Sequence, residues 1–423
     1  MTYRVNQRGH AEVGGCDLVD LAQDWGTPLY VYDEETVRVL CREYVGALGD
    51  RGEAFYSAKA FGSPAFLRLV ASQGLGLDVV SAGELEFGLR AGYPGGRIHL
   101  LGNNKGPEDL EAAWRAGATV VIDGFHEFDL LDQVVPAGGR VRCQVRLSPG
   151  VRPETHDFVS TGQLDSKFGF SVEAGAAREA VERALGHDRV ELAGLHSHIG
   201  SQILDLGGHR AAMEIVLDLV AGLHRDLGFQ PERLGAGGGL GIAYMEEDDP
   251  PTPRHFVQSL LGWLEEGTAQ RGLATPMLEV EPGRSIAGPA GVAVYRVGSI
   301  KDIPGVRRYV AVDGGMGDNI RPKLYGARYQ PFLAADPAGQ AAGTVTIAGK
   351  YCESTDVLAS DVPLPPVATG DLLAVPAAGA YTLSMSSNYN GMPRPAVVLV
   401  REGRATLIRR RETVDDLLAP EVF

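Results

Sequence analysis

The heptapeptide Ala54-Phe55-Tyr56-Ser57-Ala58-Lys59-Ala60 has the pattern of a short apolar strand that ends on a single lysine. A helix is expected to begin soon after it, with Ser63 as its N-cap and Pro64 as its first residue. Folds in which strands and helices alternate place their chemistry at the carboxyl ends of parallel strands. Lys59 is therefore either an amine that forms a Schiff base or a lysine that extends its charge into solvent from a strand end.

Seven further apolar runs follow, and helical stretches separate most of them. The eight expected strands are residues 54–59, 76–81, 97–102, 118–123, 140–148, 190–200, 233–239 and 277–281. Longer helices are expected at 172–185, 209–227 and 254–271, and Ser81 with Glu84 has the spacing of a capping box. Eight such units over about 250 residues match a closed (β/α)₈ barrel of the TIM type. An open doubly wound sheet is the competing arrangement, and the count of eight favours closure.

The pattern changes after residue 284. Apolar runs at 292–297, 309–312, 344–348, 372–375 and 396–400 are separated by turns rich in glycine and proline. Few helical patterns lie between these runs, which predicts a mainly antiparallel β domain. We therefore expect an α/β chain with a (β/α)₈ barrel at 31–283 and a β domain at 284–423, which residues 1–30 join.

The composition is typical of a soluble protein that binds a small molecule. The chain has 423 residues and a formal net charge of −15, so a nucleic-acid surface is not expected. Its scattered cysteines form no CxxC pair, which disfavours a disulfide framework and a zinc ribbon; they are Cys16, Cys41, Cys143 and Cys352. No apolar run is long enough to cross a membrane, and the polar residues 1–8 lack the apolar core of a secretion signal. We expect a cytoplasmic protein without a membrane or nucleic-acid partner.

Glycines and a Gly-Arg pair follow the last two expected barrel strands. Residues 235–241 read Gly-Ala-Gly-Gly-Gly-Leu-Gly, and the eighth strand ends on Glu281-Pro282-Gly283-Arg284. Barrels commonly bind phosphate at the loops after strands seven and eight, where glycine lets main-chain N–H groups approach an anion. The glycines do not fit GxGxxG, which disfavours a dinucleotide site. A phosphate cradle and a plain tight turn remain the two interpretations, and Glu281 with Arg284 is either part of a site or a surface ion pair.

His196 and His198 end the sixth expected strand. Alternate residues of a strand face the same way, so both side chains can line the mouth of a barrel. Zinc is one interpretation, but no third ligand stands at motif spacing, and no metal is expected. A histidine that stacks on a ring, with the Ser201 hydroxyl on a phosphate, fits as well. One of the two histidines is expected to be structural.

These strand-end features match the parts of one ligand. Lys59 suits an aldehyde, His198 a ring and Glu281 a pyridine nitrogen. A phosphate is matched by Ser201, Gly237, Gly238, Gly239 and Arg284. Pyridoxal 5′-phosphate (PLP) contains all of these parts, so we expect it as the cofactor.

The chain resembles the fold-type III, or alanine-racemase-like, PLP-dependent decarboxylases almost from end to end. In the barrel the resemblance rests on residues 55–60, Ser166-Lys167-Phe168-Gly169, residues 196–201, Gly237-Gly238-Gly239 and residues 281–284. In the β domain it rests on residues 313–316, 321–325, Cys352-Glu353-Ser354, Gly379-Ala380-Tyr381 and Ser386-Ser387-Asn388-Tyr389-Asn390. Residues 321–325, Cys352-Glu353-Ser354 and the Asn-Tyr-Asn ending resemble the diaminopimelate branch of that family.

The resemblance implies a role for each matching residue. Lys59 would carry the Schiff base, His198 would stack on the cofactor ring, and Glu281 would hold the protonated ring nitrogen. The phosphate would be bound by Ser201, Gly237, Gly238, Gly239, Gly283, Arg284 and Tyr381. The substrate would contact Arg284, Arg321, Tyr325, Glu353 and Tyr381. Cys352 would be the general acid, supplied by the other subunit of a homodimer.

The implied activity is decarboxylation of meso-2,6-diaminopimelate to L-lysine, the last step of lysine biosynthesis. A related decarboxylase for another basic or carrier-bound amino acid and a non-catalytic PLP-binding homologue are the alternatives. The chain departs from the family at Lys350 and Tyr351, where smaller or apolar residues are usual, and at Thr355, where glycine is common. These departures bear on fine substrate preference.

Overall fold

The computed structural model describes residues 3–151 and 166–422, and this part of the chain divides into two compact units. The barrel unit comprises Leu40–Ile242 and Asp249–Ser285. The β unit comprises Met1–Val39, Ala243–Asp248 and Ile286–Phe423. Helix α2 (Glu34–Leu48) and helix α10 (Arg284–Ala290) each contain residues of both units.

The barrel unit is a closed ring of parallel strands. Eight strands form the ring within the described residues, because β8 pairs with β9 and β13 pairs with β5. They are β5 (Gly52–Ser57), β6 (Gly76–Val79), β7 (Ile98–Leu100), β8 (Thr119–Ile122), β9 (Val141–Ser148), β11 (Val190–Ser197), β12 (Arg233–Gly235) and β13 (Met277–Val280). A short strand, β10 (Phe170–Ser171), adds to β9. The predicted barrel is confirmed, and the open sheet is excluded.

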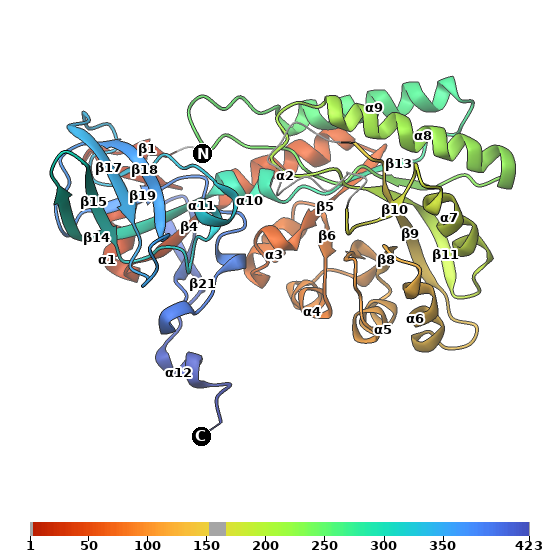
Figure 1. The fold of residues 1–423 in the computed structure, drawn as a ribbon, viewed down its shortest axis with the longest axis horizontal. Coiled ribbons are helices and arrows are strands. Elements are labelled where there is room, and N and C mark those ends of the chain that lie inside the picture. Colours follow the sequence, from red (N-terminus) through yellow and green to blue (C-terminus); the bar gives the residue numbers. More distant parts are fainter. Residues whose placement is uncertain (1–2, 152–165, 423) are drawn as a thin grey trace. The chain divides into compact units, whose positions relative to one another are not determined.

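Helices cover the outside of this ring (Figure 1). Those after α2 are α3 (Pro64–Ala71), α4 (Ala82–Ala91), α5 (Pro107–Ala116), α6 (His126–Val134), α7 (Ala176–Gly186), α8 (Gly207–Leu227) and α9 (Pro253–Gln270). Helices α8 and α9 lie side by side, and α3 to α6 pack one against the next. Because helices cover the ring, its strands are buried almost throughout. No helix of the described ranges has the length and apolarity to cross a membrane.

Local signals explain where several helices begin. Ser81 Oγ accepts from the N–H of Glu84 and caps α4, but the Glu84 carboxylate accepts from Val80 N–H at 2.9 Å, so the predicted capping box is only half formed. Helix α7 begins at residue 176 and not at 172, because β10 and a left-handed Gly175 (φ +80°) precede it.

The β unit is built on a mainly antiparallel sheet, as predicted. Its strand order is β18-β17-β15-β14-β4-β20-β21, and β19 pairs with both β14 and β16. The bounds are β4 (Leu29–Asp33), β14 (Gly291–Ile303), β15 (Arg307–Val312), β16 (Phe332–Leu333), β17 (Gly343–Ala348), β18 (Val357–Leu364), β19 (Leu372–Val375), β20 (Ala396–Arg401) and β21 (Arg404–Arg409). Strand β15 is parallel to β17, and β20 is parallel to β4.

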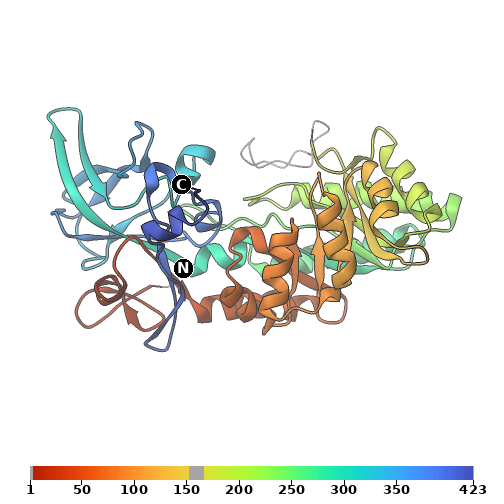
Figure 2. The same ribbon diagram turned by 90° about the horizontal axis from the view of Figure 1, so that it is seen from below.

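N-terminal residues are an integral part of the β unit. Strand β4 pairs with both β14 and β20. Before it come β1 (Arg4–Val5), β2 (Ala11–Val13), β3 (Cys16–Asp17) and α1 (Leu18–Trp25). Apolar side chains of β2, β3 and α1 share one core with β14, β19 and β20, and Figure 2 shows this N-terminal segment beside the later strands of the unit. Two short helices complete the unit, α11 (Arg321–Tyr325) and α12 (Val414–Leu418).

Candidate active site

Lys59 lies just beyond the carboxyl end of a barrel strand. Strand β5 ends at Ser57, and Lys59 is the middle residue of a short 3₁₀ helix, η1 (Ala58–Ala60). Ala58 and Ala60 are buried while Lys59 is exposed. The flanking alanines therefore fix the turn, and the amine stays accessible to a ligand. The strand has the expected length but begins and ends two residues earlier than the predicted range 54–59.

Glu281 follows β13 and is a buried carboxylate held by a histidine. His196, in β11, places Nε2 at 2.8 Å from Glu281 Oε1. Burial raises the pKa of Glu281, but His196, His198 and Lys59 outweigh it and lower the pKa to about 2. Glu281 is thus negatively charged at neutral pH. His196 is the structural histidine of the pair that the sequence predicted.

His198 is the other member of that pair, and its ring is neutral. The main-chain N–H of Gly238 donates to His198 Nδ1 at 3.2 Å, which makes Nδ1 an acceptor. Burial holds the pKa of His198 well below its usual value, and the positive charges of Lys59 and Arg146 add to this effect. A neutral imidazole beside Lys59 offers a flat, uncharged face to a ring.

The glycines after β12 allow a close approach of main chain to main chain. Gly237 and Gly239 have left-handed φ angles of +68° and +104°. A Cβ on Gly238 would lie 2.2 Å from the carbonyl oxygen of Glu281, and one on Gly237 would lie 2.6 Å from that of Ser197. Side chains are thus excluded from this loop, and main chain without side chains allows an anion to approach closely.

Arg284 brings a positive charge to the same unit. It is 7% exposed, and its Nη2 donates to Ser201 Oγ at 2.7 Å. Gly283 precedes it directly. The guanidinium N–H groups and the hydroxyl O–H can all donate hydrogen bonds from neighbouring positions. Such a group of donors suits the oxygens of a phosphate.

The barrel unit therefore meets the chemical demands of PLP. It has an accessible amine at the end of β5, an ionised carboxylate after β13, a neutral histidine ring and a side-chain-free glycine loop with an arginine. All of these residues follow carboxyl ends of ring strands. No three His, Cys, Asp or Glu side chains within residues 3–151 and 166–422 are placed to hold a metal ion.

Sequence reasoning missed Asp78. This buried carboxyl group of β6 accepts from Ser57 Oγ at 2.6 Å. Burial and the charge of Glu281 raise its pKa well above the usual value, against the opposing charge of Lys59. The signal was a charged residue inside the apolar run 76–80.

Arg321, in the β unit, is a buried cation surrounded by tyrosines. It is 4% exposed, donates from Nη1 to Tyr329 Oη at 2.5 Å and stacks over the Tyr244 ring at 4.7 Å. Its Nε has no hydrogen-bond partner among the described residues, and no carboxylate of these residues pairs with it. Such a cation is suited to a carboxylate that comes from outside the chain.

The other predicted residues of the β unit lie in two loops and in α11. Cys352 and Glu353 are exposed in the turn between β17 and β18, and Tyr325 is half-buried at the end of α11. Tyr381 adopts a left-handed φ of +58°, which is rare for an aromatic residue and costs conformational energy. Functional sites are a common place for such outliers.

Comparisons with known proteins show which protein family the chain is similar to. A family profile described as "Pyridoxal-dependent decarboxylase, pyridoxal binding domain" matches residues 34–288. The chain is 45% identical to a diaminopimelate decarboxylase of Bacillus subtilis, with 99% of this chain and 96% of that protein aligned. It is 45% identical to the one of Mycobacterium tuberculosis, with 97% and 94% aligned.

Solved structures agree with these similarities. The crystal structure of a diaminopimelate decarboxylase from M. jannaschii in co-complex with L-lysine has a TM-score of 0.92 and 33% identity, over 100% of this chain and 98% of that one. A lysine/ornithine decarboxylase from Vibrio vulnificus has a TM-score of 0.76 and 23% identity, over 91% and 98%. The second likeness concerns the fold alone.

Proposed function

The chain belongs to the diaminopimelate decarboxylases, a family of pyridoxal-dependent decarboxylases, and from this premise we propose which residues carry out its chemistry. Its reaction is the decarboxylation of meso-2,6-diaminopimelate to L-lysine and CO₂, and its cofactor is PLP. The observation that carries this conclusion is an identity of 44–45% along nearly the whole chain.

The barrel residues would hold the cofactor. Lys59 would bind its aldehyde through Nζ, His198 would face its ring, and Glu281 would keep its ring nitrogen protonated. The phosphate would be held by Ser201, Gly237, Gly238, Gly239, Gly283 and Arg284, with Tyr381 from the β unit. When bound, PLP supplies an electron sink for the electron pair that the departing CO₂ leaves behind. The low pKa of Glu281 supports this assignment, because only an ionised carboxylate stabilises a protonated ring nitrogen.

The substrate carries two carboxylates and two ammonium groups. Arg284, Arg321, Tyr325 and Tyr381 would bind carboxylate oxygens, and Glu353 would pair with the distant ammonium. Cys352 would donate the proton that replaces CO₂. Its exposure supports this role, since Cys16, Cys41 and Cys143 are buried.

We also propose a homodimer in which Cys352 and Glu353 of one subunit complete the site of the other. The support is the resemblance of these two residues and of Arg321 to their counterparts in the family. A cytoplasmic location is part of the proposal, and the absence of disulfides among the cysteines of the described residues suits a reducing compartment.

CO₂ release from a panel of amino acids tests the reaction. The protein with added PLP is incubated with meso-2,6-diaminopimelate, L-lysine, L-ornithine and L-arginine. We expect release only from the first, with one equivalent of L-lysine formed. Release from L-ornithine or L-arginine instead would assign the chain to a sister activity, and release from none would indicate a non-catalytic homologue.

Lys59→Ala tests the cofactor assignment. The variant is expected to lose the absorption band of covalently bound PLP and to escape labelling when borohydride is added, because no other residue would supply the amine. Peptide mapping of the reduced parent protein should place the label on Lys59. A variant that keeps the band would refute the assignment.

A further inference from the structure

The proton donor of the proposed function lies in a turn held by a second loop. Cys352 belongs to the segment between β17 and β18, and its main-chain N–H donates to Asn390 Oδ1 at 2.9 Å. The two residues are 38 positions apart in the chain. An exposed thiol depends on its main chain for its position, so this bond restrains where the thiol can lie.

Asn390 has an unusual conformation that suits this task. It lies in the short helix η5 (Tyr389–Gly391), where its φ of 54° and ψ of 23° are left-handed. Asparagine tolerates that conformation better than most residues with a side chain. The preceding residue, Tyr389, stacks on Tyr351, the residue before Cys352, with ring centroids 6.2 Å apart and planes at 12°. The two loops are thus joined by a ring pair and a hydrogen bond at adjacent positions.

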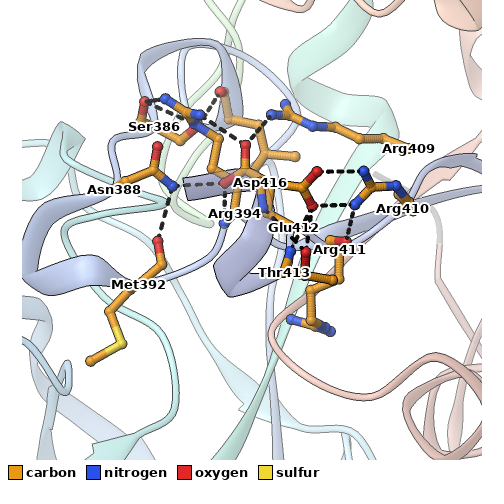
Figure 3. Close-up of polar contacts among 11 residues, drawn as sticks. Ser386, Asn388, Met392, Arg394, Arg409, Arg410, Arg411, Glu412, Thr413 and Asp416 are labelled. Carbon is orange, nitrogen blue, oxygen red and sulfur yellow. Dashed lines mark hydrogen bonds and ion pairs between the residues drawn. The ribbon is translucent and has the colours of Figure 1, made fainter. Parts of the chain in front are cut away.

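The loop that carries Asn390 is in turn fixed by Glu412 (Figure 3). Asn388 Nδ2 donates to Glu412 Oε2 at 2.7 Å, and Arg394 Nη1 donates to Glu412 Oε1 at 2.9 Å. The Arg394 main-chain N–H also donates to Glu412 Oε2, and the Arg394 guanidinium reaches the carbonyl of Ser386 at 3.4 Å. Glu412 therefore anchors Asn388 and Arg394, which lie on either side of Asn390 in the chain.

Charge strengthens this anchor. Burial raises the pKa of Glu412, but the hydrogen bonds from the Arg394 main chain, the Arg394 side chain and Asn388 outweigh it and lower the pKa. Glu412 is therefore ionised at neutral pH, and charge-assisted hydrogen bonds are the stronger kind.

We propose that Asn390 is a positioning residue for the Cys352 proton donor, and that Glu412 holds the Asn390 loop in place through Asn388 and Arg394. The proposal rests on the proposed function, in which Cys352 donates the proton. Asn390 acts through the main chain of Cys352, and the hydrogen-bond acceptor on its side chain is the feature required.

Three substitutions distinguish the effect of losing the hydrogen-bond acceptor of Asn390 from the effect of changing the left-handed backbone conformation. Asn390→Gly keeps the left-handed conformation and removes the acceptor. Asn390→Asp keeps an acceptor oxygen and tolerates the same conformation. Glu402→Gly is the matched control, because Glu402 is also left-handed (φ 50°) and lies in the turn between β20 and β21 of the same unit.

Kinetics per bound PLP give the first measurement. Asn390→Gly is expected to lower kcat by at least about tenfold, because small displacements of a reacting group reduce rates steeply, while KM changes little. Asn390→Asp should recover most of kcat, and Glu402→Gly should match the parent protein. A role in folding alone would reduce PLP loading and leave kcat per bound PLP unchanged, which would overturn the proposal.

Hydrogen exchange gives a measurement that needs neither substrate nor cofactor. The amide of Cys352 should exchange at least about tenfold faster in Asn390→Gly than in the parent or in Asn390→Asp, because the bond that protects it is gone. Unchanged exchange would overturn the proposal.

Cys352→Ala distinguishes this inference from the proposed function. If Cys352→Ala loses activity and Asn390→Gly does not, the positioning role is wrong and the proposed function stands. If Cys352→Ala keeps the parent kcat, Cys352 is not the proton donor, and both its role in the proposed function and the positioning role of Asn390 are wrong.

Discussion

Asp318 is a carboxyl group buried beneath two tyrosines of the β unit. Tyr30 and Tyr295 both donate to its Oδ2, and the N–H of Gly315 donates to Oδ1 at 2.9 Å. Burial raises the pKa of Asp318 to about 6, although these three hydrogen bonds oppose the rise. The cost of removing the charge from water is therefore the larger effect at this residue.

A raised pKa makes the stability of the protein depend on pH. The folded state holds the Asp318 proton more tightly than the unfolded state, so Asp318 contributes most stability below about pH 4 and loses that contribution as pH rises through about 6. The amide that Asp318→Asn introduces does not titrate in this window. The free energy of unfolding of Asp318→Asn relative to the parent should thus rise by roughly 2.4 kcal/mol between pH 4 and pH 7. Urea unfolding at several pH values measures it, and a difference that stays constant with pH would contradict the shifted pKa.

The strands and helices were largely predictable from the sequence, and the exceptions have physical causes. The eight barrel strands were found because runs buried on both faces are continuously apolar. The end of β5 was placed two residues late, because a 3₁₀ turn with alanines on either side of Lys59 keeps the apolar pattern of a strand. Residues 1–30 were expected to join the β domain, but the pairing of β4 with β14 and β20 was not predicted, because local periodicity does not encode pairing between distant strands.

In the candidate site, the residues of the motifs could be predicted from the sequence, but the residues that form hydrogen bonds around them could not. Lys59, His198 and Glu281 stand at strand ends that the alternating pattern locates. The contacts of Asp78 with Ser57 and of Asn390 with Cys352 join residues distant in sequence, and only the structure shows them. Asp78 is a charge inside an apolar run and Asn390 belongs to the Asn-Tyr-Asn motif, but no local pattern indicates which distant residue each one contacts.

An ion-pair network ties neighbouring strands of the barrel together. Arg233 of β12 bonds to Glu279 of β13 at 2.9 Å and also to Glu53 of β5. Glu279 is 2% exposed and accepts a further bond from Gln144 of β9 at 2.6 Å. A buried carboxylate with one main cationic partner is vulnerable to the loss of that partner.

Arg233→Met is therefore expected to destabilise the protein strongly. It leaves Glu279 buried without its cation, which costs about 3–5 kcal/mol in the free energy of unfolding. Arg142→Met is the matched control, because Arg142 pairs with the exposed Glu191 and Glu232, and exposed pairs contribute about 0–1 kcal/mol. Chemical denaturation of both variants tests the difference. Equal losses of unfolding free energy in the two variants would show that the ion pairs of Arg233 contribute no more stability than an exposed pair.

At the scale of the whole molecule, the residues of the proposed site belong to two compact units, and this proposal has consequences for assembly. Lys59 belongs to the barrel unit, and Cys352 belongs to the β unit. A single sequence contains both motifs but does not say which copy of the β unit serves which barrel. The proposed homodimer assigns them to different subunits, which predicts that an isolated monomer is inactive.

Mixing two inactive variants tests this arrangement directly. In a mixed dimer of Lys59→Ala and Cys352→Ala subunits, one site would contain both substitutions and the other would contain neither. Because a two-fold dimer has two equivalent sites, random exchange of subunits should restore about one quarter of the parent activity. Each variant alone, carried through the same exchange, is the control and should stay inactive. If Lys59 and Cys352 of one subunit served the same site, every site in the mixture would contain a substitution and activity would not return, which would exclude the shared site even if the protein is a dimer.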